Sequence, residues 1–124
     1  MASVSEEWPT FFPDGCPAAA TPQVDGPVFR FSTGSTDDWK CAKELGHYSR
    51  APECQRSGLS CYRTVEDLRA HARILPKFRE AKVSRADLRP DHGKILQTGR
   101  LGHHTLWLRA RYYSDCSVLF QEII

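Results

Sequence analysis

A regular alternation of side-chain types runs from His104 to Tyr113. One side carries His104, Leu106, Leu108 and Ala110, and the other side carries Thr105, Trp107, Arg109 and Arg111. Successive side chains of a strand point to opposite faces, so this segment predicts a long strand with one apolar face. His104 shares the face of Leu106 and Leu108. We therefore expect His104 to be buried and His103 to point outward.

Shorter apolar segments, separated by turn residues, predict further strands. They are Val28–Phe31, Leu59–Tyr62, Lys82–Ser84, Lys94–Leu96 and Val118–Ile124. The turns between the later segments are short, and no helix-length periodic segment follows Pro76. The second half of the chain is therefore expected to form a mainly antiparallel sheet.

Residues 36–45 predict a first helix. Ser35 or Thr36 can cap its amino end, because a side-chain oxygen there accepts a hydrogen bond from the free backbone N–H groups. Gly46 is suited to stop it, because glycine readily adopts the left-handed conformation at a helix end. Trp39 is expected on the inner face of this helix.

Residues 65–75 predict a second helix. Thr64 precedes the segment as a cap, and Asp67 is placed to complete a capping box. The inner stripe would consist of Leu68, Ala72 and Leu75. Pro76 should end the helix, because the residue before a proline is disfavoured in helical conformation.

Residues 1–27 have the composition of an extended arm. Prolines recur every four or five residues, at Pro9, Pro13, Pro17, Pro22 and Pro27. Proline blocks the helix interior, and the aromatic Trp8, Phe11 and Phe12 give the segment side chains to bury. We expect this Pro-rich arm to pack on a single domain formed by residues 28–124.

The fold class expected from these elements is a small, single-domain α+β protein, with two helices in the first half and a mainly antiparallel sheet. The core is predicted from the inward positions of each element. Its members are Phe29, Phe31, Trp39, Leu59, Leu68, Leu75, Val83, Leu106, Leu108 and Leu119.

The composition indicates the class of protein and the compartment in which it is expected. The chain has 124 residues, of which 40% are hydrophobic and 26% are charged, as in an ordinary globular domain. Its apolar runs are far shorter than the roughly 20 residues that cross a bilayer, so no membrane contact is expected. The first ten residues lack the basic and apolar regions of a secretory signal, and we expect a cytoplasmic location.

The five cysteines are spread along the chain without a CxxC pair. In a reducing compartment this pattern predicts five free thiols. Cys41, His47, Cys54 and Cys61 fall within one segment and offer the four donors that zinc requires. Their spacing lacks the tight knuckle of known structural sites, so the sequence predicts that no metal is bound.

Positive charge is concentrated in one part of the chain. Residues 50–111 contain 14 Lys and Arg but only 6 Asp and Glu. Such a surface suits an acidic protein, a nucleotide or a nucleic acid. The proposed binding residues are Trp107, Arg109, Arg111 and His103, because an aromatic ring beside arginines can stack on a base or anchor a protein. Trp107 is expected to be partly covered by the arm, through Phe12 or Pro13, or else to be open to a partner.

An alternative, enzymatic function comes from three separate positions. Arg30 lies on the first strand, the segment 58–64 leads from a strand into a helix, and Glu122 follows Gln121 near the end of the chain. This order resembles that of ADP-ribosyltransferases, which use NAD. The resemblance implies that Arg30 would hold the dinucleotide, that Ser60 and Tyr62 would shape the nicotinamide pocket, and that Glu122 would act in the transfer. This alternative requires the three positions to converge in space.

Several nucleotide and hydrolase motifs are missing from the chain. It contains no Walker A loop, no GxGxxG, no HExxH and no GxSxG. A binding module without catalysis is therefore the first hypothesis, and the NAD-dependent enzyme is its alternative.

Overall fold

Six strands form one antiparallel sheet in the order β4-β5-β2-β1-β3-β6. Their bounds are β1 Gly26–Ser32, β2 Leu59–Tyr62, β3 Lys82–Leu88, β4 Gly93–Gln97, β5 His103–Leu108 and β6 Gln121–Glu122. The computed structural model describes residues 7–123, so residues 1–6 of the predicted arm and residue 124 of the predicted last strand lie outside the described residues. The predicted α+β class, as one small domain with an antiparallel sheet, is confirmed.

The sheet is built around β1. This strand pairs with β3 over its whole length, from Gly26 opposite Leu88 to Ser32 opposite Lys82. On its other side β1 meets β2, and β2 pairs with β5. The long pairing with β3 explains why β1 extends beyond the four residues predicted from hydrophobicity alone.

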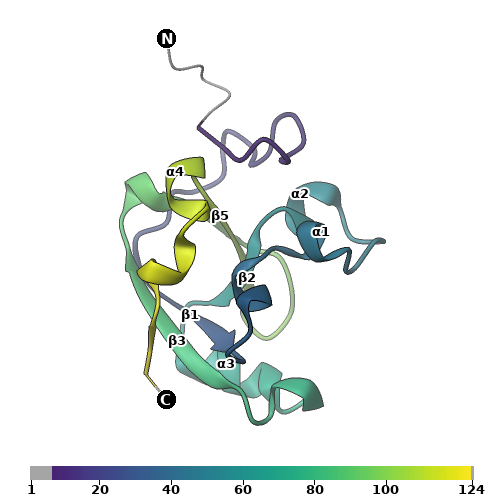
Figure 1. The fold of residues 1–124 in the computed structure, drawn as a ribbon, viewed down its shortest axis with the longest axis vertical. Coiled ribbons are helices and arrows are strands. Elements are labelled where there is room, and N and C mark those ends of the chain that lie inside the picture. Colours follow the sequence, from purple (N-terminus) through teal and green to yellow (C-terminus); the bar gives the residue numbers. More distant parts are fainter. Residues whose placement is uncertain (1–6, 124) are drawn as a thin grey trace.

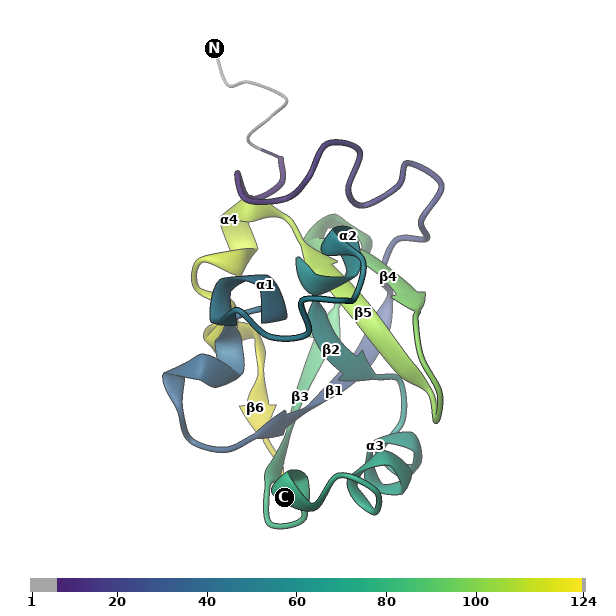
Figure 2. The same cartoon turned by 90° about the vertical axis from the view of Figure 1, so that its right-hand side faces the viewer.

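Four short α-helices occur in the described part of the chain. They are α1 Ala42–Leu45, α2 Glu53–Arg56, α3 Val65–Ala72 and α4 Ala110–Tyr113. Helix α4 lies at one end of the molecule beside residues 7–25, and α3 lies at the opposite end (Figures 1 and 2). No helix within residues 7–123 has both the length and the apolar character that a bilayer crossing needs.

The first predicted helix is interrupted. A 3-10 turn covers Thr36–Trp39, and α1 starts only at Ala42, because Lys40 and Cys41 have extended backbone conformations. The N–H of Cys41 donates to the phenolic oxygen of Tyr113 at 3.0 Å and is therefore not available to a continuous helix. A tertiary contact has overridden the local helical tendency here.

Ser35, Gly46 and Thr64 cap helical segments, as predicted. The Ser35 side chain accepts from the N–H of Asp37, and Gly46 has the left-handed φ of 70° that ends α1. The Thr64 side chain accepts from the N–H of Asp67 at 3.0 Å. The second helix, however, ends at Ala72 and is three residues shorter than expected.

The prediction of one long strand from His104 to Tyr113 is wrong. Strand β5 ends at Leu108, and α4 follows directly. The turn is held from outside, because the N–H of Ala110 donates to the carbonyl of Glu7 at 2.8 Å. The predicted last strand is likewise reduced to β6, since residues 116–119 form a 3-10 turn.

Each face of the sheet carries a hydrophobic cluster. The larger cluster joins β1, β2, β3, β4 and β5 to residues of α4 and the segments around it, and the smaller one lies under α3. Six of the predicted core residues are buried: Phe29, Leu59, Leu68, Val83, Leu106 and Leu108. The other four are half-buried: Phe31, Trp39 and Leu119 pack against the edges of these clusters, whereas Leu75 belongs to neither.

Residues 7–25 contact the domain at several points. Val24 is fully buried, and the ring of Phe11 packs edge-on against Tyr113. Cys16 forms a disulfide with Cys54 of α2. The prediction of five free thiols is therefore wrong: three cysteines are free and buried, whereas this pair is brought together by a tertiary contact that the spacing of cysteines does not reveal.

Candidate functional site

A cavity of about 580 Å³ opens beside strands β1, β2 and β5. Its wall is formed by residues of the 37–48, 55–62, 71–78 and 98–105 segments, together with Arg30 and Phe31 of β1. The volume falls within the range of small-molecule sites, which is roughly 300–1,000 Å³.

A chain of hydroxyl and imidazole groups crosses this cavity. The Oγ of Ser60, on β2, lies 2.9 Å from the Nε2 of His103 on β5. The Nδ1 of His103 lies 3.2 Å from the Oγ1 of Thr98, which in turn lies 2.7 Å from the Oγ1 of Thr105. The antiparallel pairing of β2 with β5 brings Ser60 and His103 together, since Tyr62 sits directly opposite His103.

A second hydroxyl–imidazole pair lies next to the first. The phenol of Tyr62 is hydrogen-bonded to the Nδ1 of His71, which comes from α3. The His71 and His103 rings lie 6.0 Å apart and nearly perpendicular, and the Tyr62 ring lies within 6 Å of both. Burial raises the pKa of Tyr62 far above its usual value, so the phenol stays protonated in its hydrogen bond with His71.

Both imidazoles have lowered pKa values. Burial is the main cause for His71, and the charge of Arg100 adds to it. Burial also comes first for the pKa of His103, followed by the nearby His71, His104 and Arg30. Both rings are therefore predominantly neutral at pH 7 and can accept a proton.

Arg30 is fixed under the cavity. It is 8% exposed, and its two terminal nitrogens donate to the carbonyl oxygens of Ser60 and Asp38. Its guanidinium lies 5.8 Å from the ring of Trp39. Burial lowers the pKa of Arg30, but an arginine remains charged at any physiological pH. The side chain therefore contributes a buried positive charge next to Ser60.

The charged residues that line the cavity are predominantly basic. The basic lining residues are Arg30, Lys40, Arg56, Lys77 and Arg100, whereas the acidic ones are Asp37 and Asp38. Lys77 lies 5.0 Å from the Phe78 ring and 3.4 Å from the Tyr48 hydroxyl. Arg100 is exposed and has no side-chain hydrogen bond or ion pair within residues 7–123.

The rim contains exposed apolar side chains in an unusual backbone setting. Tyr48, Ile74 and Leu101 line the cavity and are 64%, 59% and 42% exposed. Tyr48 and Leu101 are also the non-glycine residues of positive φ in the described chain, at 56° and 55°. Such conformations cost of order 1–3 kcal/mol each and concentrate at functional sites.

The structure separates the residues of the enzymatic alternative. Arg30, Ser60 and Tyr62 all line the cavity. Glu122 does not line it: this exposed residue belongs to the edge strand β6 and lies 3.6 Å from Lys82. The enzymatic alternative requires Glu122 to meet Arg30 and the Ser60–Tyr62 strand, but β3 stands between β1 and β6 and keeps the glutamate apart from them.

The four proposed binding residues do not form one exposed surface. His103 lines the cavity, whereas Trp107 is 3% exposed and donates from Nε1 to the Cys54 carbonyl at 2.8 Å. An open Trp107 surface is therefore ruled out. Phe12, one of its expected covers, instead packs against Trp8 and Phe11.

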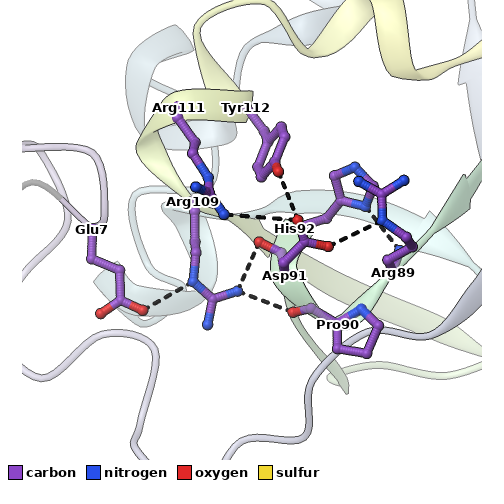
Figure 3. Close-up of polar contacts among 8 residues, drawn as sticks. All are labelled: Glu7, Arg89, Pro90, Asp91, His92, Arg109, Arg111 and Tyr112. Atoms are coloured by element: carbon purple, nitrogen blue, oxygen red, sulfur yellow. Dashed lines mark hydrogen bonds and ion pairs between the residues drawn. The ribbon is translucent and has the colours of Figure 1, made fainter.

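Arg109 and Arg111 belong to a polar network at the other end of the domain (Figure 3). Arg109 donates to the Glu7 carboxylate at 2.9 Å and to the backbone carbonyls of Pro90 and Asp91. The carboxylate of Asp91 accepts from Tyr112 at 2.8 Å and lies 3.7 Å from Arg111. The prediction that Arg109 and Arg111 share a strand face with Trp107 is wrong, because the strand ends at Leu108 and the chain turns into α4.

The proposed soft-ligand cluster does not converge. Cys54 is bonded to Cys16, and burial raises the pKa of Cys61 to about 12, so this thiol stays protonated. Within residues 7–123, no group of three or more His, Cys, Asp or Glu side chains is arranged to hold a metal ion.

His71, Thr98 and Arg100 are residues of the cavity that the sequence did not single out. His71 follows Leu68 by three positions and so lies near the inner stripe of α3, which was its only signal. Thr98 and Arg100 sit in the turn between β4 and β5, where sequence alone indicates only a loop.

Comparison with known proteins adds no further residue: no family model matches the chain, and no curated protein or solved structure is significantly similar to it.

Proposed function

We propose that the protein binds a phosphate-bearing small molecule of the nucleotide type in the cavity beside β2. The observation that carries this proposal is the convergence of basic side chains from separate segments around one hollow, with only Asp37 and Asp38 to offset them. Basic groups around a concave, partly apolar site attract and retain phosphate, and focus the field on it.

The rim supports a ligand with a flat, apolar part. Tyr48 and Phe78 flank Lys77, and Ile74 and Leu101 add exposed apolar surface. An aromatic ring beside a cation is the composition that stacks on a nucleobase. Residues held at positive φ in this rim favour a binding function, because evolution retains such strain chiefly where it is used.

NAD is the second candidate, favoured by the meeting of Arg30, Ser60 and Tyr62 in the cavity. The fit is incomplete. The terminal nitrogens of Arg30 already donate to carbonyl oxygens, so they cannot hold a pyrophosphate without breaking those bonds. Glu122 is outside the cavity, so transfer chemistry through this glutamate is not part of the proposal.

We also infer an oxidising compartment for the protein. The disulfide between Cys16 and Cys54 supports an oxidising environment over the cytoplasm expected from the sequence, since disulfides rarely persist in the cytosol. A nucleotide ligand would then be an extracellular or organellar one.

A ligand titration tests the proposal. ATP, NAD, ADP-ribose and inorganic pyrophosphate are each titrated into the protein and followed by thermal shift and calorimetry. At 100 times its dissociation constant, a ligand should stabilise the fold by about 2.7 kcal/mol. An acidic peptide and a short RNA serve as competing probes for the protein and nucleic-acid alternatives.

The Arg100→Glu variant is expected to weaken nucleotide binding, because it reverses an exposed cavity charge. Arg79→Glu is the matched control, because Arg79 is exposed and does not line the cavity. Equal loss in both variants would indicate a general charge effect. Absence of binding by all four phosphate ligands would refute the proposal.

A further inference from the structure

Ser60 and His103 are arranged as a nucleophile and its base. Their 2.9 Å contact lies within hydrogen-bond range of the Oγ and Nε2 atoms. When Nε2 accepts the serine proton, the remaining proton of His103 lies on Nδ1 and points to Thr98 at 3.2 Å. Thr98 is itself positioned by Thr105. A hydroxyl, an imidazole and a third group that orients the imidazole are the parts of an activated nucleophile.

We propose that Ser60 is a catalytic nucleophile that cleaves activated esters or thioesters, with His103 as its general base and Thr98 as a positioning residue. The proposal shares the cavity of the proposed function but does not require its anionic ligand. Failure of nucleotide binding would therefore leave it standing, and its own failure would leave nucleotide binding unaffected.

Access and charge both favour this assignment. Ser60 is exposed and lines the cavity of about 580 Å³, so a small acyl group can reach its Oγ. Burial holds the pKa of His103 below its usual value, so the ring is neutral at pH 7 and ready to take a proton. Arg30 donates to the Ser60 carbonyl and so fixes the backbone that carries the nucleophile.

The reaction balances within the protein and water. The Ser60 Oγ bonds to the acyl carbon while its proton passes to the His103 Nε2. The bond to the leaving group then breaks, and the departing oxygen or sulfur takes that proton. Water next attacks the acyl-serine and gives a proton to His103, which returns it to the Ser60 oxygen as the carboxylic acid leaves.

The test uses the full chain with p-nitrophenyl acetate and a fluorophosphonate probe. We expect the probe to attach to the peptide that contains Ser60, and we expect ester hydrolysis to rise with pH through the pKa of His103, below about 6.5. His103→Gln should lower the rate of labelling by 100-fold or more, on the order of a lost general base. Ser60→Ala, which changes an exposed side chain, should abolish the adduct.

Two controls separate the proposed reaction from background reactivity. His104→Gln removes the neighbouring imidazole, which bonds to the Gly102 carbonyl, and should leave labelling intact above the pKa of His103, because His104 acts only on that pKa. Ser114→Ala removes an exposed hydroxyl away from the cavity and should do the same. Circular dichroism establishes that each variant is folded. The proposal fails if folded wild-type protein gives no adduct at Ser60, or if His103→Gln labels as fast as wild type.

Discussion

The indole Nε1 of Trp107 donates a hydrogen bond of 2.8 Å to the carbonyl oxygen of Cys54, whose sulfur is bonded to Cys16. This contact links the end of β5 to α2 and to residues 7–25. Because Trp107 is only 3% exposed, movement of α2 would leave its N–H buried without a partner. The disulfide therefore holds α2 in position over the Trp107 side chain.

Breaking the disulfide is expected to destabilise the protein by about 3–4 kcal/mol, because a cross-link between residues 38 apart restricts the unfolded chain. Urea unfolding with and without reductant measures the change. The Trp107 fluorescence should shift to longer wavelength as α2 loosens.

The Cys16→Ser, Cys54→Ser double variant is the control, since reductant should not change its stability further. Alkylation under denaturing, non-reducing conditions should modify only Cys41, Cys61 and Cys116. Modification of five cysteines would contradict the disulfide.

Leu106→Ala is expected to cost about 2–5 kcal/mol of unfolding free energy, because Leu106 is fully buried in the larger cluster. Leu96→Ala provides a comparison on the neighbouring strand β4. Leu96 is 46% exposed, so its truncation should cost no more than about 0.5 kcal/mol. Equal effects in chemical denaturation would mean that the face assignment of β5 is wrong.

Local signals predicted much of the fold. The strand Leu59–Tyr62 has the predicted bounds, and the Thr64 cap depends only on its neighbours. The end of β5 was not predictable in this way. Its turn at Ala110 is held by the backbone of Glu7, more than a hundred positions earlier in the chain.

The candidate site was harder to predict than the fold. Ser60 and His103 are 43 positions apart and meet only because β2 pairs with β5. Strand pairing across such a distance is a tertiary property, which alternation in one segment cannot reveal. For Trp107 the error was in its burial. Alternation correctly placed Trp107 on the face of β5 that points away from Leu106, but contact with helix α2 buries it there as well.

Tyr112→Phe is expected to raise the pKa of Asp91. The hydrogen bond from Tyr112 is the main cause that holds this pKa below its usual value, with Arg89 contributing next after the opposing effect of burial. Carboxyl NMR signals followed between pH 2 and 6, roughly the range around the reference value, measure the change.

The same depressed pKa predicts a direction for stability. The unfolded chain binds the Asp91 proton more tightly, so this contribution is present above the unfolded pKa and is lost as the pH falls through the folded one. Tyr112→Phe should bring the folded pKa of Asp91 closer to its unfolded pKa, so the variant should lose less stability as the pH falls. An unchanged Asp91 titration in the variant would show that the contact does not persist in solution.

The two cavity histidines should make the protein less stable in mild acid. Both pKa values are lowered in the folded state, so the unfolded chain takes up these protons first. The contribution is present above the unfolded pKa of about 6.5 and is lost as the pH falls from there through the folded values. Urea unfolding at a series of pH values should show this decline.

Arg100→Ala is expected to raise the pKa of His71 towards its usual value. Arg100 is the charged neighbour that lowers it, and burial, the larger cause, stays unchanged, so only part of the shift should disappear. His103 gives an internal reference in the same NMR titration, because its charged neighbours are His71, His104 and Arg30 and its main cause is burial. The variant should therefore move the His71 midpoint more than the His103 midpoint, and it should weaken the loss of stability below pH 6.5, about the unperturbed value. Equal movement of both midpoints, or none at His71, would show that Arg100 does not face this side of the cavity and would remove it from the proposed phosphate-binding rim.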